Sequence, residues 1–379
     1  MRSREFSRGF LRLVVASVSA VAGTASGQTT YTYATLGGRA LQLDLYRATS
    51  VPPNERTPCV VYIHGGGWQS GTRSGVPPYV VQLTASGVSV ASASYRLTSQ
   101  AGRWGSEPVT FPAQIHDVKG AIRWLRANAG ALALDPLRFA TWGPSAGGHL
   151  SALVGTSGDV AEIEGSVGGN TSVSSRVQAF VDYFGPTDLL QMNPDVTTPP
   201  GSSVNHDAPN SPESRLIGFD DPDQGVGVLR ANITNPAPPF PFYARLAEQA
   251  NPLTWVDGTD PETFIAHGTA DTVVPLRQSE RLEAAMQAAG VTARFVSVAN
   301  AGHGGFPEIV HTQATTFLIE RLRCRADVNR NGEVDFFDYL DFVALLNAGN
   351  WQADFDHSGV VDFFDYLDFA AEVSNGCSP

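Results

Sequence analysis

Residues 139–150 read Phe-Ala-Thr-Trp-Gly-Pro-Ser-Ala-Gly-Gly-His-Leu. The apolar run Phe139–Trp142 predicts a buried strand, and the segment Ala146–Val154 has the composition of a helix. Between them lies Gly143-Pro144-Ser145-Ala146-Gly147, a G-x-S-x-G pattern that occurs once in the chain. In the context of strand, turn and helix, this pattern predicts a sharp turn that exposes the hydroxyl of Ser145 at the edge of a sheet.

Strands alternate with helices on both sides of this turn. Residues 31–46 alternate in polarity around Gly37-Gly38 and predict an opening hairpin. The other predicted strands are Cys59–Ile63, Val88–Tyr95, Val177–Phe184, Thr263–Ala266 and Ala293–Val298. The other predicted helices are Pro112–Asn128, Pro275–Ala289 and Glu308–Leu322. This order predicts an α/β fold with a doubly wound, mainly parallel sheet, in which functional residues gather at the carboxyl ends of the strands.

Two stretches interrupt the alternation. Residues 192–212 are rich in Pro, Ser, Thr and Asn, and residues 232–241 are rich in Pro. We interpret them as an irregular insertion between the strands at 177–184 and 263–266. A loop of this length either borders a functional site or decorates the surface, and the sequence leaves both open.

A glycine-rich loop follows the strand Cys59–Ile63. It reads His64-Gly65-Gly66-Gly67-Trp68. Three glycines let backbone N–H groups turn toward a bound oxygen, which is the geometry of an oxyanion hole. The predicted donors are the N–H groups of Gly66, Gly67 and Ala146.

A serine nucleophile needs a base, and the base needs an acid that orients it. Asp271 follows the strand Thr263–Ala266, and His303 follows the strand Ala293–Val298. The chain order Ser145, Asp271, His303 is the one that this kind of sheet imposes. We therefore predict that these three residues form the catalytic triad. His267 is the rival base, and Asp257 and Asp260 are the rival acids.

With these motifs, the sequence resembles the α/β-hydrolase superfamily, and within it the HGGG-bearing esterases of the hormone-sensitive-lipase-like and bifunctional feruloyl/acetyl-xylan esterase group. The resemblance covers residues 30–322. It rests on the segments His64–Trp68, Trp142–Leu150, Ser211–Gly218, Ala250–Leu253 and His267–Pro275. It implies that Ser145 is the nucleophile, His303 the general base and acid, and Asp271 the orienting acid, with no cofactor for catalysis. Pro144 departs from the pattern of many relatives, and we expect it to stiffen the turn.

The charge of the chain is uneven. The 379 residues carry a formal net charge of −12, which argues against nucleic acid as a partner because the phosphate backbone demands a basic surface. Residues 324–379 hold eleven acidic residues against Arg325 and Arg330. This change in composition predicts a module boundary near Cys324.

The acidic segment is a duplication. Phe-Phe-Asp-Tyr-Leu-Asp-Phe occurs at 336–342 and again at 363–369, and each copy follows a loop with oxygen-bearing side chains at alternate positions and a central glycine. This spacing predicts two calcium loops that resemble EF-hands and two helices. The predicted ligands are Asp327, Asn329, Asn331, Glu333 and Asp338 in the first loop, and Asp354, Asp356, Ser358, Val360 and Asp365 in the second.

The twelfth position of each loop is Asp instead of Glu, and this, with the duplication, resembles a dockerin module. The resemblance implies two structural Ca²⁺ ions and a cohesin-type protein partner. A calcium-stabilised appendage without a partner is the alternative. Cys324 and Cys377 flank the module, and the sequence leaves open whether they form a disulfide. Cys59 lies in an apolar strand and is interpreted as a buried free thiol.

Four arginines precede the apolar run Leu13–Ala22, and small residues follow it. This pattern predicts a secretory signal peptide over residues 1–27 and a secreted, cell-surface or periplasmic protein. The run is too short for a membrane span. The predicted organisation is therefore a signal peptide (1–27), an esterase domain (28–323) and a dockerin-like module (324–379).

These motifs predict a secreted serine carboxylesterase. The resemblance favours acetyl or feruloyl esters on plant polysaccharide such as xylan. The alternatives are a general esterase of short-chain lipid or aryl esters and a noncatalytic scaffold protein that retains the hydrolase fold.

Overall fold

In the computed structural model, the described residues are 27–49, 51, 56–105, 108–196, 201–324, 326–329, 334–355 and 360–374. Within them, eight strands form one sheet in the order β1-β2-β4-β3-β5-β6-β7-β8. The strands are β1 (Gln28–Leu36), β2 (Arg39–Tyr46), β3 (Thr57–Ile63), β4 (Ser89–Ala93), β5 (Leu134–Pro144), β6 (Ala179–Tyr183), β7 (Thr263–Gly268) and β8 (Ala293–Val298). The helices around the sheet are α1 (Pro78–Val81), α2 (Ala113–Ala127), α3 (Ala129–Leu132), α4 (Ala146–Thr156), α5 (Ala161–Glu164), α9 (Arg277–Ala288) and α10 (Glu308–Leu322).

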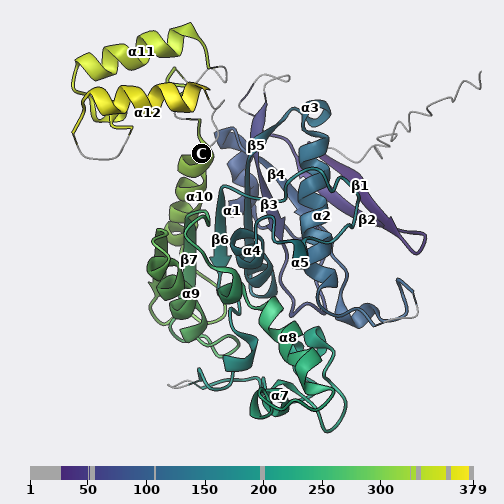
Figure 1. The fold of residues 1–379 in the computed structure, drawn as a ribbon. Coiled ribbons are helices and arrows are strands. Elements are labelled where there is room, and N and C mark those ends of the chain that lie inside the picture. The colour runs from purple at the N-terminus through teal and green to yellow at the C-terminus, as the bar shows by residue number, and fades with distance from the viewer. Residues whose placement is uncertain are drawn as a thin grey trace, which may run out of the picture.

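The pairing of the strands confirms the predicted sheet. β1 and β2 form the antiparallel hairpin, β2 pairs antiparallel with β4, and the pairs from β4 to β8 are parallel. Helices lie on both sides of the sheet (Figure 1). This is the α/β-hydrolase fold that the sequence predicted.

Side chains alternate between two cores, as the period of two in a strand requires. In β3, Cys59, Val61 and Ile63 point to one face, where they pack with α2 and α4. Val60 and Tyr62 point to the other face, where they pack with α1 and α10. Both faces of the parallel strands are therefore covered, which explains their continuous apolar runs.

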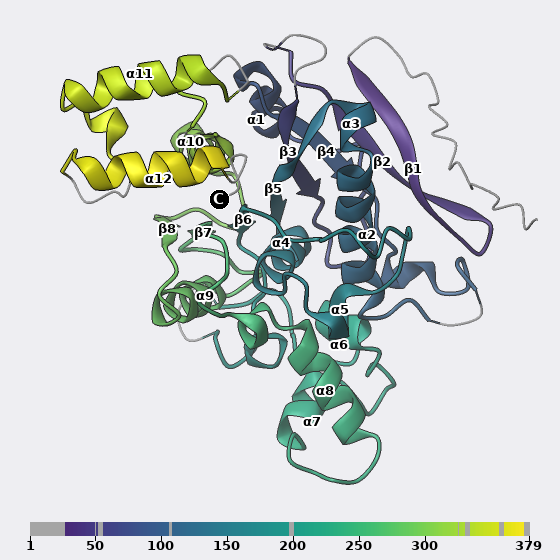
Figure 2. The same ribbon diagram turned by 45° about the horizontal axis from the view of Figure 1, so that its top comes forward.

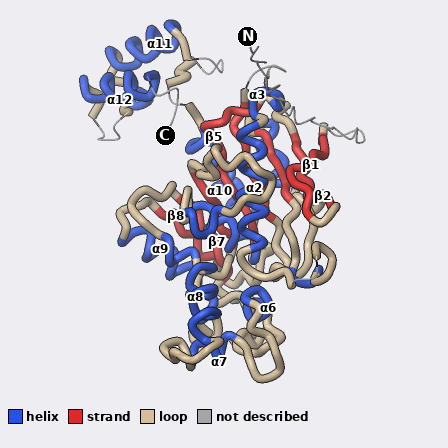
Figure 3. The backbone as a smooth tube through the Cα atoms, turned by 45° about the vertical axis from the view of Figure 1, so that its right-hand side comes forward, coloured by secondary structure: helices blue, strands red, loops and turns tan. Residues whose placement is uncertain are grey.

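The segment between β6 and β7 is more regular than the sequence predicted. It contains the helices α6 (Pro212–Ile217), α7 (Val226–Ala231) and α8 (Phe240–Ala250). They form a cap at the end of the molecule where the strands β5 and β6 end (Figures 1 and 3). Prolines at the first positions of α6 and in the first turn of α8 are compatible with a helix, because those positions lack an N–H partner in any case.

A separate pair of helices lies at the opposite end of the molecule from the cap (Figure 2). These are α11 (Phe336–Asn347) and α12 (Phe363–Ser374), which contain the two copies of the repeat. Phe342 and Phe369, at equivalent positions of the repeat, stack with ring centroids 4.1 Å apart and planes 2° from parallel. They form a small core with Cys324, Ala326, Ala353 and Phe355. The module thus has its own core of a few apolar side chains.

Cys59 is the buried free thiol that the sequence predicted, whereas the state of Cys324 was left open by the sequence. Cys59 is buried and free, and burial raises the pKa of its thiol to about 12, so it is an inert core residue. Cys324 is disulfide-bonded. Cys377 lies outside the described residues, as do residues 1–26 of the predicted signal peptide. No helix of the described residues is long and apolar enough to cross a membrane.

Candidate active site

Ser145 lies at the junction of β5 and α4, where the G-x-S-x-G pattern predicted a sharp turn. Its backbone has φ 56° and ψ −126°, an unfavourable region for a residue with a side chain. The N–H of Ser145 donates to the carbonyl of Tyr183 at the end of β6 (2.8 Å), and the N–H of His149 donates to the carbonyl of Ser145 (2.9 Å). The turn is thus strained but fixed on both sides, which holds the hydroxyl at the carboxyl end of the sheet.

The turn packs directly against the glycine-rich loop that follows β3. A Cβ atom at position 147 would lie 2.0 Å from the carbonyl oxygen of Ile63, so this position admits only glycine. In the loop itself, Gly66 has φ 111°, and its carbonyl accepts hydrogen bonds from the N–H groups of Gln69 and Ser70 (3.0 Å each). Gly66, Gly67 and Ala146 line the same pocket as Ser145. The structure therefore brings the three predicted oxyanion residues to the predicted nucleophile.

Asp271 and His303 meet at the ends of β7 and β8. Nδ1 of His303 lies 2.7 Å from Oδ2 of Asp271. The other carboxylate oxygen of Asp271 accepts the N–H groups of Val273 (2.7 Å) and Val274 (3.0 Å). Burial by itself would raise the pKa of Asp271, but hydrogen bonds from His267 and His303 outweigh it and hold this pKa well below its usual range. Asp271 is thus a fixed negative charge behind His303.

His267, the rival base, also contacts Asp271 but lies in the core. Its Nε2 is 3.2 Å from Oδ2 of Asp271, and its side chain is fully buried. Its Nδ1 lies 2.7 Å from the hydroxyl of Ser279, and its Nε2 lies 2.9 Å from the carbonyl of Val274. His303, in contrast, is 23% exposed and lines the pocket with Ser145. Both nitrogens of His267 have protein partners, so its geometry is that of a support for Asp271.

The rival acids lie on a different loop. Asp257 accepts from the N–H and the hydroxyl of Thr259, and Asp260 accepts from the N–H of Asp257. These contacts close the turn that precedes β7. Neither residue lines the pocket of Ser145.

Two other histidines of the motifs are structural. Nδ1 of His149 accepts a hydrogen bond from the indole N–H of Trp68 (3.1 Å), and its Nε2 lies 2.7 Å from the carbonyl of Ala250. Burial lowers the pKa of His149 to about 4, so its ring is neutral and Nε2 donates to that carbonyl. His64 stacks on Tyr95, and burial lowers its pKa as well. These contacts tie the glycine-rich loop to α4 and to the end of α8.

The pocket around Ser145 has a volume of about 790 Å³. Its walls come from the glycine-rich loop, the turn at Ser145, Phe184 after β6, the loops of Asp271 and His303, and the insertion. The ring of Phe184 lies 4.5 Å from the ring of His303. From the insertion, Val204, His206, Pro212 and Glu213 line the pocket. Of the two interpretations that the sequence left open, the structure places this part of the insertion at the border of the site.

Sequence reasoning missed two polar pairs at this border. Nδ1 of His206 lies 2.9 Å from Oε1 of Glu213, with both side chains buried. Arg215 donates to Oε1 of Gln69 (2.7 Å), and Gln69 also lines the pocket. The segment Ser211–Gly218 contributes to the family resemblance, but the amino-acid sequence does not indicate that Glu213 contacts His206 from the preceding loop.

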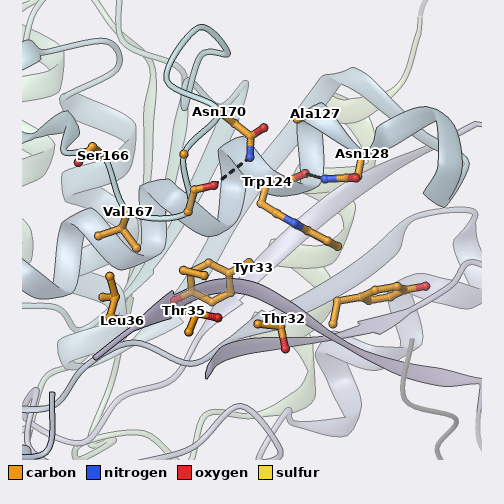
Figure 4. Close-up of a pocket in the computed structure, with 14 residues that line it drawn as sticks. Thr32, Tyr33, Thr35, Leu36, Trp124, Ala127, Asn128, Ser166, Val167 and Asn170 are labelled. Carbon is orange, nitrogen blue, oxygen red and sulfur yellow. Dashed lines mark hydrogen bonds between the residues drawn. The ribbon is translucent and has the colours of Figure 1, made fainter. Parts of the chain in front are cut away.

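A second large cavity, of about 890 Å³, lies away from this site between β1 and α2. Trp124 of α2 and Asn128, the residue that caps the end of α2, face Thr32 and Thr35 of β1 across it (Figure 4). The described residues that line it include no Asp, Glu, His, Lys, Arg or Cys. Its described lining therefore lacks the carboxylate and imidazole groups that surround the pocket of Ser145.

A comparison with protein families agrees with this geometry. The family model described as BD-FAE matches residues 43–286, which include the glycine-rich loop, the turn at Ser145 and Asp271. The chain belongs to the BD-FAE family. The match ends before His303, so the family assignment of this chain rests on the other parts of the site.

Individual relatives of this BD-FAE chain are esterases by name. It is 29% identical over 270 residues to esterase LipQ of Mycobacterium tuberculosis (strain ATCC 25618 / H37Rv), with 70% of this chain and 55% of LipQ covered. It thus spans about half the length of that relative. A truncated carbohydrate esterase from gut microbiota has 30% identity and a TM-score of 0.62, with 77% of this chain and 96% of that structure covered. The bifunctional GH43-CE of Bacteroides eggerthii has 33% identity and a TM-score of 0.61, with 77% of this chain and 38% of that structure covered.

The predicted calcium loops are only partly within the described residues. Asn331, Glu333, Asp356 and Ser358 lie outside them, whereas Asp327, Asn329, Asp338, Asp354, Val360 and Asp365 lie inside. Asp338 accepts the N–H groups of Asn329 (3.0 Å) and Asp335 (2.9 Å). Asp365 accepts the N–H groups of Phe355 (2.6 Å) and Asp362 (2.7 Å).

Each carboxylate at position 12 thus folds back on its loop, where it accepts the N–H three residues before it and one N–H near the start of the loop. Among the described residues, no group of three or more His, Cys, Asp or Glu side chains is arranged to hold a metal ion. The oxygen-rich composition of both loops suits a hard cation such as Ca²⁺, and their metal ligation remains a prediction.

Proposed function

We propose that this chain is an exported serine carboxylesterase. The observation that carries the proposal is the convergence of Ser145, His303 and the glycine-rich loop on one pocket, with Asp271 bound to His303 at 2.7 Å. A nucleophile on a strained turn, a base in the same pocket and a buried acid bound to the base are the groups that acyl transfer needs. The match of this chain to the BD-FAE family and the esterase names of its relatives support the same chemistry.

In the proposed reaction, the hydroxyl oxygen of Ser145 attacks the ester carbonyl while His303 takes the serine proton. The N–H groups of Gly66, Gly67 and Ala146 stabilise the negative charge on the carbonyl oxygen. The C–O bond to the alcohol then breaks, His303 gives its proton to the departing alcohol, and an acyl-serine remains. Water, deprotonated by His303, releases the acid and restores Ser145.

Asp271 keeps the proton of His303 on Nδ1, so that Nε2 is free to accept from the serine. It also stabilises the positive charge that His303 carries during the reaction. The turn amides of Val273 and Val274 hold the carboxylate in place for both tasks.

We propose acetyl or feruloyl esters on plant polysaccharide, such as xylan, as the substrate. The support is membership in the BD-FAE family and the likeness to two structures with carbohydrate-esterase names at 30% and 33% identity.

We also propose a division of the chain into a signal peptide (1–27), a catalytic domain (28–323) and a dockerin-like module (324–379). Two Ca²⁺ ions would be bound by the carboxylates and oxygen-bearing groups of the two loops, and they would fix the starts of α11 and α12. Exposed apolar side chains recur at equivalent positions of the two helices, namely Phe336, Phe337 and Leu340 and then Phe363, Phe364 and Leu367. This repeated surface fits a cohesin-type protein partner.

The experiment that tests the function is the release of acetate and ferulate from acetylated, feruloylated xylan, beside a panel of p-nitrophenyl esters. Ser145→Ala is the inactive variant, and Ser172→Ala, at an exposed loop serine, is the matched control. We expect release by the wild type and by Ser172→Ala, and none by Ser145→Ala. Turnover of synthetic esters alone would refute the polysaccharide substrate, and turnover of no ester at all would indicate a noncatalytic scaffold.

A further inference from the structure

One polar atom in the pocket has no task in the chemistry proposed above. Oε2 of Glu213 is buried and has no hydrogen-bond partner among the described residues, although Glu213 lines the same pocket as Ser145. The side chain of Glu213 is only 3% exposed. A buried carboxylate oxygen without a protein donor is costly, and at a pocket wall a molecule bound in the pocket can supply the donor.

The carboxylate cannot easily turn away from the pocket. Oε1 lies 2.9 Å from Nδ1 of His206, and the backbone N–H of His206 donates to Oδ1 of Asn193 (3.0 Å). The start of α6 is fixed as well, because Ser211 caps it by accepting the N–H of Ser214 (3.1 Å). Both ends of the Glu213 contact are therefore held by other parts of the insertion.

Gln69, which lines the same pocket as Glu213, carries a hydrogen-bond donor. The amide of Gln69 uses its oxygen to accept from Arg215, which leaves its Nε2 hydrogens for a ligand. A Cβ atom on Gly67 would have Pro212 at 3.5 Å and Nε2 of Gln69 at 3.7 Å, so these two groups flank the same point of the glycine-rich loop. Glu213 follows Pro212 directly. An acceptor and a donor on one wall match a hydroxyl group, which both donates and accepts, whereas an ammonium group only donates.

From this arrangement we infer that Oε2 of Glu213 accepts a hydrogen bond from a hydroxyl group of the substrate, so that the pocket selects hydroxylated esters. The inference rests on the proposed function and names a substrate-binding residue for it. The hydroxyl belongs either to the sugar on the alcohol side or to a phenol on the acyl side. The two sources share the same chemistry at Glu213.

The test uses two pairs of esters that differ in hydroxyl groups. A mono-O-acetyl methyl xyloside is compared with cyclohexyl acetate, and methyl ferulate with methyl 3,4-dimethoxycinnamate. Glu213→Gln preserves the volume of the side chain and keeps one oxygen for the contact with His206. The amide NH₂ then takes the place of Oε2, so a donor replaces the acceptor. Glu248→Gln, at an exposed position of α8, is the matched control.

For Glu213→Gln we expect kcat/KM to fall roughly 10- to 100-fold on the hydroxylated member of at least one pair, as for a lost hydrogen bond to a charged group, and less than about 3-fold on its partner. The pair that shows the selective loss identifies the source of the hydroxyl. Equal losses on all four esters would show that Glu213 is structural, and no loss on any would show that it does not touch the substrate. Either result overturns the inference.

Two further measurements keep the test decisive. The wild type alone should prefer the hydroxylated member of one pair by about 10-fold or more, and equal rates on both members of both pairs would refute the inference even if Glu213→Gln failed to fold. If the wild type hydrolyses none of the esters, the proposed function fails, and calorimetric binding of the same esters to Ser145→Ala and to Ser145→Ala/Glu213→Gln decides the question. A roughly 10-fold weaker affinity in the double variant supports Glu213 as the hydroxyl acceptor, and equal affinities refute it.

Discussion

Replacement of Asp271 by Asn probes the part of the site that the structure defines best. The oxygen Oδ1 accepts two turn amides, and Oδ2 lies 2.7 Å from Nδ1 of His303. An Asn side chain has one oxygen, which we expect to stay with the two amides. Its NH₂ group then faces His303, where the carboxylate had accepted. Nδ1 of His303 must become an acceptor, which moves the ring proton to Nε2.

That change of tautomer removes the base. With the proton on Nε2, His303 cannot take the proton of Ser145, and the imidazolium formed in the reaction also loses its negative partner. In a serine protease, the same Asp to Asn change in the triad lowers kcat by about 10⁴-fold, and we expect a loss of roughly 10³- to 10⁴-fold here. KM should change by less than about 3-fold, because Asp271 does not line the pocket.

The assay is steady-state hydrolysis of p-nitrophenyl acetate at pH 7–8. Asp257→Asn, in the loop before β7, is the matched control and should retain wild-type kcat. A kcat of Asp271→Asn within about 10-fold of the wild type, in a folded protein, would refute the assignment of Asp271. Full activity of Asp271→Asn together with inactivity of Asp257→Asn would move the role to the other loop.

Four other outcomes follow from the structure. The pKa of Asp271 is depressed in the folded state, so the ionised carboxylate stabilises the fold above the unfolded pKa of 3.8, and this stabilisation is lost as the pH falls from there toward the folded pKa. In urea titrations, the difference in unfolding free energy between the wild type and Asp271→Asn should therefore narrow between pH 5 and pH 2, and a constant difference would contradict this. Burial raises the pKa of Asp182 to about 7, so at pH 8 the folded state must hold a buried negative charge that costs stability. Asp182→Asn removes this charge and should stabilise the fold by roughly 2–4 kcal/mol at pH 8 and hardly at pH 4, whereas destabilisation at pH 8 would refute this. Trp68→Phe leaves Nδ1 of buried His149 without its donor and should cost about 1–3 kcal/mol of stability in urea unfolding, whereas unchanged stability would show that this hydrogen bond is dispensable. Calorimetric titration of the full chain should show two Ca²⁺ sites, one of which disappears in Asp338→Ala and the other in Asp365→Ala, and no heat of binding in the wild type would refute the calcium loops.

Local patterns were sufficient to predict the frame of the molecule. The predicted helix Glu308–Leu322 has the same bounds in the structure, and the predicted strands reappear as β3 to β8 with small shifts. β5 begins at Leu134, five residues before the predicted strand Phe139–Trp142. The intervening Asp135-Pro136 indicates a turn, but pairing of Thr57 with Leu134 extends the strand. Such an extension depends on a neighbour distant in sequence, which no local pattern records.

The cap was harder to predict for the same reason. α6 and α7 have six residues each, so neither completes two turns of a clear apolar period. They are stabilised by tertiary contacts, such as the N–H of Val226 that donates to the hydroxyl of Ser214 (3.0 Å). The contact between His206 and Glu213 joins a loop to the start of a helix, and only the folded chain brings the two together.

The sequence predicted which loops carry the candidate site residues, but it could not separate the two histidines that contact Asp271. The motifs placed Ser145, Asp271 and His303 on three loops at the same end of the sheet, and the structure places them there. The choice between His267 and His303 depended on exposure. Both contact Asp271, but one is enclosed by β7 and α9 while the other reaches the pocket. Spacing along the chain carries no information about that difference.

Catalysis by Ser145 requires a covalent acyl intermediate on its hydroxyl oxygen. The decisive measurement is acid quenching of the wild type during turnover of p-nitrophenyl acetate, followed by mass spectrometry of the peptides. We predict a mass gain of one acetyl group on the peptide that contains Ser145, and no gain on that peptide in Ser145→Ala. An acetyl group found on another residue, or rapid turnover with no acylated peptide at any quench time, would contradict the account.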